Sequence, residues 1–170
     1  MTYPTEMSVS TEAREGVTLD DRRVAAWHAF LRAHATIRML LEDDLARERG
    51  LALTDYDVLV QLSSAPEGRL RMQELAGRLL FSRSRVTRLV DRMERDELVR
   101  RDPCADDRRG TFAVITDGGR RKLREATGVH LRGVATHFGS PLDDDDVVTL
   151  QRAMDKILAA NHPPDHIERG

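Results

Sequence analysis

Residues 72–93, MQELAGRLLFSRSRVTRLVDRM, contain two helical patterns that meet at a short junction near residues 80–82. Ala76 lies between two leucines and offers the small side chain that two crossing helices need. The apolar residues of the second pattern recur at the spacing of one buried helical face. They are Val86, Leu89, Val90 and Met93. We therefore predict a helix-turn-helix, although its junction has Leu80 where many such turns carry glycine.

The outer side of the second predicted helix carries small hydroxyls and arginines. At 100° per residue, the apolar face directs these side chains toward solvent. Arginine bonds guanine in a bidentate way, hydroxyls bond bases or phosphates, and a helix N-terminus favours phosphate. The pattern indicates DNA reading in the major groove, although a single arginine is more often part of an ordinary solvated face. The candidate contacts are Ser82, Arg83, Ser84, Arg85, Thr87 and Arg88.

A charged hairpin is expected directly after this motif, within residues 99–116, VRRDPCADDRRGTFAVIT. Two runs favour strands, 98–101 and 111–115, and the loop between them adds Asp107, Arg108 and Arg109 as candidate DNA contacts. An arginine in such a wing can enter the narrow, electronegative minor groove. Asp107 can accept hydrogen bonds from the guanidinium group of Arg109 and so hold the loop shape.

In the rest of the chain, long stripes of apolar residues at helical spacing predict further helices. The first helix runs from about residue 20 to Gly50, and two more lie within 117–160. We expect Thr54 and Thr116 to cap helices and Pro141 to begin the last one. A short extended piece is expected at Leu70. The predicted fold is mainly α with a small β wing: six helices plus a β-hairpin, in a winged helix-turn-helix.

The composition is typical of one intracellular domain, and the charge distribution indicates that the middle of the chain binds a polyanion. The net charge of the 170 residues is −2, yet residues 69–124 hold 16 Lys plus Arg against 9 Asp plus Glu. The remaining residues hold 11 against 20, and such asymmetry favours a nucleic-acid partner for the basic part. With no apolar run of roughly 20 residues and no signal-peptide core, we expect no membrane association. The single cysteine fits a cytoplasmic location.

The chain resembles the multiple antibiotic resistance regulator (MarR) family of bacterial repressors. The resemblance rests on DRRGTFAVITDGG, residues 107–119, and on SRSRVTRLVDRMERDELVRR before it. It implies an intertwined helical homodimer, a palindromic DNA operator and control by a small aromatic or phenolic effector. The implied organisation is a flexible arm at 1–19, a family domain at 20–163 and a flexible tail at 164–170. Within that domain, 20–50 and 117–160 would dimerise, and 54–116 would bind DNA.

Four residues are candidates for lining an effector cleft: Trp27, Phe30, His34 and Asp57. Ordinary core or dimer packing is the alternative explanation for each aromatic residue. Asp57 and Arg88 resemble a carboxylate–arginine pair found in urate-responsive relatives, but Trp27 does not lie far enough upstream to complete that pattern.

Other functions have weaker support. Cys104 raises the alternative of a redox-responsive regulator, although an incidental surface thiol is favoured. The histidine pairs 130/137 and 162/166 do not make a closed metal set, so we expect no metal and no cofactor. The aspartates at 143–146 suit a helix N-terminus. No catalytic motif is present, and a winged-helix module that binds only protein would not need the arginine-rich face.

Overall fold

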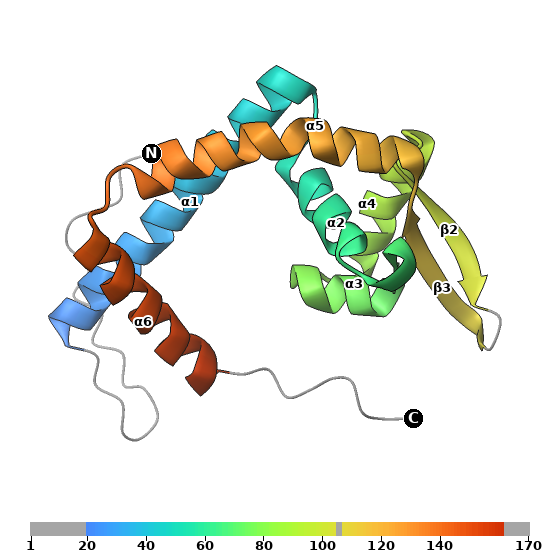
Figure 1. Ribbon diagram of the computed structural model, residues 1–170. Helices are drawn as coiled ribbons and strands as arrows, with labels where there is room; N and C mark the ends of the chain where they lie inside the picture. Colours follow the sequence, from blue (N-terminus) through green and yellow to red (C-terminus); the bar gives the residue numbers. More distant parts are fainter. Residues whose placement is uncertain (1–19, 105–106, 162–170) are drawn as a thin grey trace. The chain divides into compact units, whose positions relative to one another are not determined.

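The computed structural model describes residues 20–104 and 107–161 (Figure 1). Residues up to Thr36 form one unit and those from Ile37 onward a second, so each is described by itself. The helices are α1 (Asp21–Arg49), α2 (Leu53–Ser63), α3 (Met72–Leu79), α4 (Arg83–Arg95), α5 (Asp117–Val134) and α6 (Asp144–Ala160). A short 3₁₀ helix, η1 (Pro66–Gly68), precedes the first strand, and a short π-helical segment, η2 (Ala135–Gly139), follows α5. The predicted mainly α fold is confirmed.

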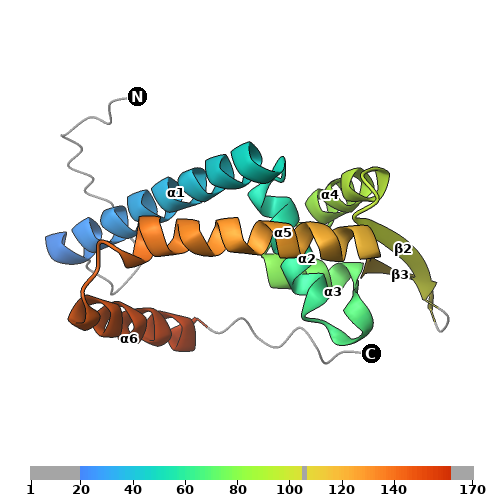
Figure 2. The same cartoon turned by 45° about the horizontal axis from the view of Figure 1, so that its top comes forward.

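A three-stranded antiparallel sheet carries the wing, and Figure 2 shows its hairpin of β2 and β3. Its strands are β1 (Arg69–Arg71), β2 (Val99–Cys104) and β3 (Asp107–Ile115), in the spatial order β1-β3-β2. The pairing runs from Val99 opposite Ile115 to Cys104 opposite Asp107. Both hairpin strands are longer than predicted, because main-chain pairing continues into the polar residues of the predicted loop. The extended piece expected at Leu70 is confirmed as β1.

The hydrophobic core lies among α2, α3, α4 and the inner side of the sheet. Its largest fully buried side chains include Leu59, Leu62, Leu75 and Met93. Each such side chain contributes roughly 1.5–3 kcal/mol of transfer free energy. From α1 only Leu41 and Leu45 are buried, and both belong to the second unit. The core therefore holds the two crossing helices and the base of the wing in one assembly.

Two predicted helix starts need correction. Thr54 does not cap α2: Ala52 is the N-cap residue, and the Leu53 N–H donates instead to a carboxylate oxygen of Glu42 on α1, at 2.9 Å. The last helix begins at Asp144 rather than at Pro141, because Asp143 and Asp146 form a reciprocal capping box. The expectation that the aspartate run marks a helix N-terminus is thus confirmed.

The start of α5 lies against the start of β2. The Thr116 hydroxyl accepts a hydrogen bond from the Gly119 N–H at 2.9 Å, which confirms the predicted cap. The same hydroxyl donates to the carbonyls of Glu97 and Leu98. A Cβ on Gly119 would lie 2.1 Å from the Leu98 carbonyl oxygen, so only glycine fits this approach. The wing is therefore fixed to α5 at its base.

The second half of α1 packs against the far part of α5. Arg132 bonds Glu48 at 2.8 Å, and His137 meets Asp44 at 2.9 Å. The hydrogen bond from His137 lowers the pKa of Asp44, and Arg47 acts in the same direction. Desolvation of the carboxylate opposes this shift. Gly133 leaves room for Leu41 at the crossing. Polar contacts on either side of the Leu41–Gly133 contact thus hold the second half of α1 against α5 and η2.

Candidate nucleic-acid interface

A left-handed residue forms the turn between α3 and α4. Leu80 has a φ of 54°, and the Phe81 N–H donates to the Ala76 carbonyl at 3.0 Å, closing the end of α3. A side chain in this conformation costs roughly 1–2 kcal/mol relative to glycine. Ala76 is buried at the crossing, as predicted. The chain therefore makes the helix-turn-helix without the glycine that such turns usually carry.

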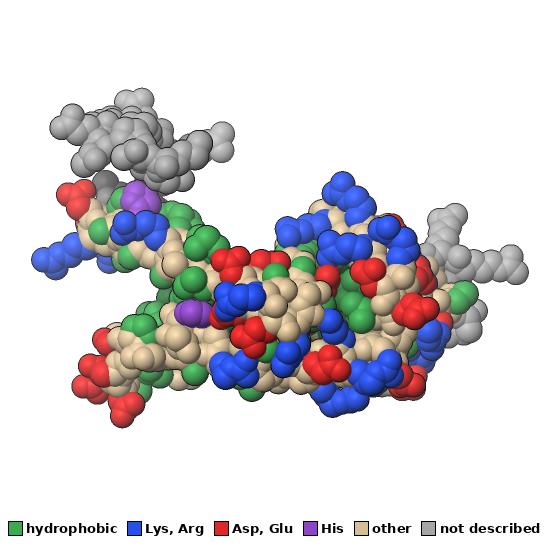
Figure 3. Space-filling view, turned by 90° about the horizontal axis from the view of Figure 1, so that it is seen from above, with side chains coloured by type: hydrophobic (Ala, Val, Ile, Leu, Met, Phe, Trp, Pro, Cys, Tyr) green, Lys and Arg blue, Asp and Glu red, His purple; other side chains and the backbone are tan. Residues whose placement is uncertain are grey.

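Helix α4 presents its polar face to solvent from its first residue. Ser82 is the N-cap, and its hydroxyl accepts from the Arg85 N–H at 3.3 Å. The remaining predicted contacts Arg83, Ser84, Thr87 and Arg88 are all exposed, whereas the four apolar residues opposite them are buried. Lys and Arg side chains gather over the winged-helix lobe on the right of Figure 3. The structure thus brings these six side chains together at one exposed helix end.

Two interactions orient individual side chains of this face. The Arg85 guanidinium lies over the Phe81 ring, 3.6 Å from its centroid. The Thr87 hydroxyl donates to the Arg83 carbonyl at 2.9 Å and keeps its lone pairs for an outside donor. The role of Phe81 was missed from the sequence, although an aromatic residue four positions before an arginine is a recognisable signal. These contacts limit the rotamers of two residues that face outward.

A buried carboxylate of α2 anchors the last turn of α4. Asp55 forms an ion pair with Arg92, and its side chain is buried. Burial raises the pKa of Asp55, and the hydrogen bond and charge of Arg92 act in the opposite direction. Because Arg92 lies beside the exposed face of α4, its ion pair with Asp55 opposes rotation of α4 about the helix axis.

Arginines of the sheet form a second basic group that sequence reasoning missed. Arg69 and Arg71 flank the ring of Phe112, at 4.9 and 5.7 Å from its centroid. Arg101 reaches from β2 to α4, where it contacts Asp91 and Glu94. The alternation of arginine on β1 was visible in the sequence, but its pairing with Phe112 required the register between β1 and β3.

At the wing tip, the backbone of Asp107, Arg108 and Arg109 belongs to β3. Their side chains lie outside the described part of the structure, so the predicted contact between Asp107 and Arg109 stays a prediction. Cys104 ends β2 and is buried, which contradicts the expected surface thiol. Its burial follows from the strand pairing, which continues past Pro103 to Cys104. The thiol is therefore shielded from solvent in this form.

The effector candidates fall in both units. Trp27, Phe30 and His34 belong to residues 21–36, where their rings follow one another along the helix at centroid distances of 5.9 and 6.1 Å. Asp57 belongs to the second unit and pairs with Arg38 at 3.7 Å. Burial raises the pKa of Asp57, and the positive charge of Arg38 opposes that shift. No ion pair between Asp57 and Arg88 is found among the described residues.

His130 of α5 lies close to this acidic group. Its ring contacts Tyr56 at a centroid distance of 4.5 Å, and its Nδ1 atom is buried with no hydrogen-bond partner among the described residues. Burial lowers the pKa of His130, although the charge of Asp57 opposes this. Within the described ranges, no group of three or more His, Cys, Asp and Glu residues is placed to hold a metal ion. None of the described helices has the length and apolar character of a membrane span.

The crossing helix pair, the exposed face of α4 and the antiparallel hairpin together define a winged helix-turn-helix, an architecture of DNA-binding proteins. The MarR family model matches residues 49–110, which include both helices of the helix-turn-helix, β2 and the first residues of β3. The AbsC structure from Streptomyces coelicolor, a MarR family transcriptional regulator, is 36% identical with a TM-score of 0.77, over 85% of this chain and 97% of that one. The chain belongs to the MarR family and is a DNA-binding transcriptional regulator.

Two further relatives agree with this assignment. Sco3205 of Streptomyces coelicolor, a MarR family regulator solved in complex with DNA, is 29% identical with a TM-score of 0.80, covering 91% of this chain and 97% of its own. YkoM of Bacillus subtilis, a helix-turn-helix transcriptional regulator, is 27% identical over 132 residues, which are 76% of this chain and 84% of YkoM. The family consists of transcriptional regulators, which are not enzymes.

Proposed function

We propose that this regulator is a repressor that binds a palindromic operator as a homodimer and releases it in response to a small ligand. The observation that carries the proposal is the exposed polar face of α4, opposite a buried apolar one. In this assignment residues 54–116 bind DNA, while 20–50 and 117–160 pair two copies. The protein would act in the cytoplasm, beside its DNA, and without catalysis.

The DNA contacts divide between two grooves. We assign the major groove to the N-terminal end of α4, with Arg83 and Arg88 as the groups able to read guanine. The hydroxyls of Ser82, Ser84 and Thr87 can bond phosphates or base edges. The ring of Phe81 orients the Arg85 guanidinium before DNA binds. The minor groove is assigned to Arg109, with Asp107 and Arg108 beside it on β3. Sco3205, which has this fold, was solved in complex with DNA, and this supports DNA binding by the present chain.

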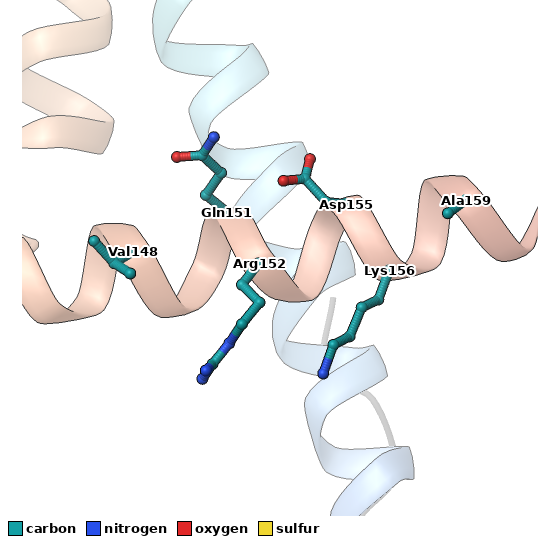
Figure 4. A pocket seen from close by; sticks show the side chains of 6 residues that line it. All are labelled: Val148, Gln151, Arg152, Asp155, Lys156 and Ala159. Atoms are coloured by element: carbon teal, nitrogen blue, oxygen red, sulfur yellow. The ribbon is translucent and has the colours of Figure 1, made fainter.

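The dimer assignment rests on apolar side chains that α6 leaves exposed. No described residue of α6 is buried, and Ile157 and Leu158 are 55% and 65% exposed. Figure 4 shows a shallow hollow on this helix, with Gln151 and Asp155 on one side and Arg152 and Lys156 on the other. A helix with an exposed apolar stripe is stable against a second surface. A two-fold pair would supply it and present two recognition helices to a palindrome.

The effector assignment rests on polar groups that lack full partners. Asp57 and Arg38 are half-buried and 3.7 Å apart, and His130 has an unpartnered ring nitrogen nearby. A phenol or an aromatic acid would bond these groups through its oxygen atoms and stack its ring on an aromatic side chain. Trp27, Phe30 and His34 belong to the other unit, and their part in effector binding stays a prediction from the sequence. Ligand binding would shift the population of DNA-competent dimers.

Selection from a random pool of DNA duplexes at low salt tests the proposal. The expected product is an inverted repeat, bound with an affinity that falls steeply as salt rises, because several phosphates are neutralised. Failure to retain any duplex would favour the alternative of a protein-binding module. Loss of binding in peroxide that Cys104→Ser prevents would favour the redox-responsive alternative.

A further inference from the structure

Arg101 joins the wing to α4 through three hydrogen bonds and an ion pair. Its Nη1 atom lies 2.6 Å from Asp91 and 2.9 Å from Glu94, and its Nη2 atom donates to the Thr87 carbonyl at 3.2 Å. Its backbone N–H donates to the other oxygen of Glu94, at 2.9 Å. One carboxylate therefore holds both the main chain and the side chain of this strand residue.

The three partners on α4 lie along one side of the helix. Positions 87, 91 and 94 are separated by four and three residues, so they follow one another on successive turns. Arg101 itself pairs with Ala113 of β3 across the sheet. Its inward-facing side chain thus connects α4 to the strand pair whose far end carries Arg109. The remaining covalent connection is the short segment of residues 96–98, which contains Glu97 at a φ of 57°.

The position of this contact makes the wing sensitive to it. Cys104, the end of β2, lies three positions after Arg101, which is roughly 10 Å of extended chain. A small rotation at the base therefore moves the tip by a larger amount. The minor-groove contact and the major-groove contacts must fit one duplex at the same time, so their spacing decides whether both form.

Charge adds a second effect. Asp91 and Glu94 are acidic residues on the helix that approaches DNA, and the Asp91 side chain is half exposed. Arg101 neutralises part of this charge in a partly buried place. Without it, two carboxylates would face the phosphate backbone from α4, and like charges repel.

We propose that Arg101 is a positioning residue for DNA binding, which holds the wing at a fixed place against α4 and offsets the charge of Asp91 and Glu94. The inference rests on the proposed DNA-binding mode. It assigns the effect of Arg101 to α4 and the wing, and not to a direct contact with phosphate.

The test measures duplex affinity for Arg101→Met, Arg109→Ala and the double variant, well below the thermal midpoint of each. Arg101→Met should weaken binding about tenfold. Arg109→Ala should then cost much less in the Arg101→Met background than in the native one, because the wing is already misplaced. Adding Asp91→Asn to Arg101→Met should recover part of the affinity. Arg100→Met is the matched control, since its side chain pairs with Asp102 and is exposed; its affinity should stay native.

Other outcomes would overturn the inference. Additive losses, with a salt dependence reduced by about one phosphate per protomer, would mean that Arg101 contacts DNA directly. A lower thermal midpoint with native affinity would mean a structural role alone. If Arg101→Met does not fold, Glu94→Gln weakens the same contact from the helix side and gives the same test. Absence of duplex binding by the native protein would instead contradict the proposed function itself.

Discussion

The winged-helix lobe and helix α6 use apolar residues in opposite ways. In the lobe, Leu59, Leu62 and Met93 are fully buried within one chain. On α6, Ile157 and Leu158 are more exposed than covered, and none of its described residues is buried. The lobe therefore completes its own core, whereas α6 has an apolar stripe that a second surface would cover. The difference separates the part that reads DNA from the part that we assign to pairing.

The largest effect should come from the core of the lobe. Leu59→Ala removes a fully buried side chain of α2 and leaves a cavity beside α5, so the free energy of unfolding should fall by about 3 kcal/mol. Urea denaturation followed by circular dichroism measures it. A loss below about 1 kcal/mol would mean that the lobe does not depend on this core.

Leu158→Glu tests the other side of the comparison. A carboxylate placed in an apolar dimer interface would be desolvated, so the dimer dissociation constant should rise by roughly a hundredfold. Sedimentation velocity over a range of concentrations measures it. Leu80→Glu is the matched control, because Leu80 is 87% exposed in the turn before α4. Equal self-association of both variants would remove α6 from the interface.

A smaller loss is expected from a single reading residue. Arg88→Ala removes an exposed guanidinium from the face of α4 and should weaken binding to the selected duplex by about tenfold, with folding and dimerisation unchanged. Arg95→Ala, in the last turn of the same helix, is the control and should cost less, because the N-terminal part of a recognition helix meets the bases. Fluorescence anisotropy measures both affinities, and a larger loss for Arg95→Ala would reverse the assigned orientation of α4.

The periodicity of apolar residues was enough to predict which helix faces are buried and which are exposed. The buried face of α4, the exposed hydroxyls and arginines, and the Thr116 cap all follow from the spacing of residues near one another in the chain. Each of these features depends on local geometry. Most of the fold and the α4 part of the candidate site were therefore predictable.

Contacts between distant residues were not predictable in this way. Glu42 replaces Thr54 as the partner of the α2 N-terminus because the packing of α1 brings its carboxylate there. The contact of Arg101 with Glu94 needs the strand to return beside the helix, and burial of Cys104 needs the register of β2 on β3. These features depend on tertiary packing, which residue spacing does not encode.

The smallest effect concerns pH and the half-buried His130. Burial lowers its pKa in the folded state, so the unfolded chain binds more protons as pH falls through the ordinary histidine value of about 6.5. Stability should be highest above that pH and should fall below it. In His130→Phe, which keeps the ring against Tyr56, the fall should be smaller in thermal scans between pH 7.5 and about 5.5. An identical pH profile for both proteins would remove His130 as its source.

In the proposed complex, two copies of α4 and of the wing read one DNA duplex together. Sequencing of duplexes selected by the native protein, in parallel with those selected by an Arg83→Ala, Arg88→Ala variant, tests it most directly. We expect an inverted repeat with half-sites about 10 base pairs apart, or a multiple of that, and loss of the preferred bases within each half-site in the variant. Enrichment of a single asymmetric site, or the same preference in both proteins, would contradict it.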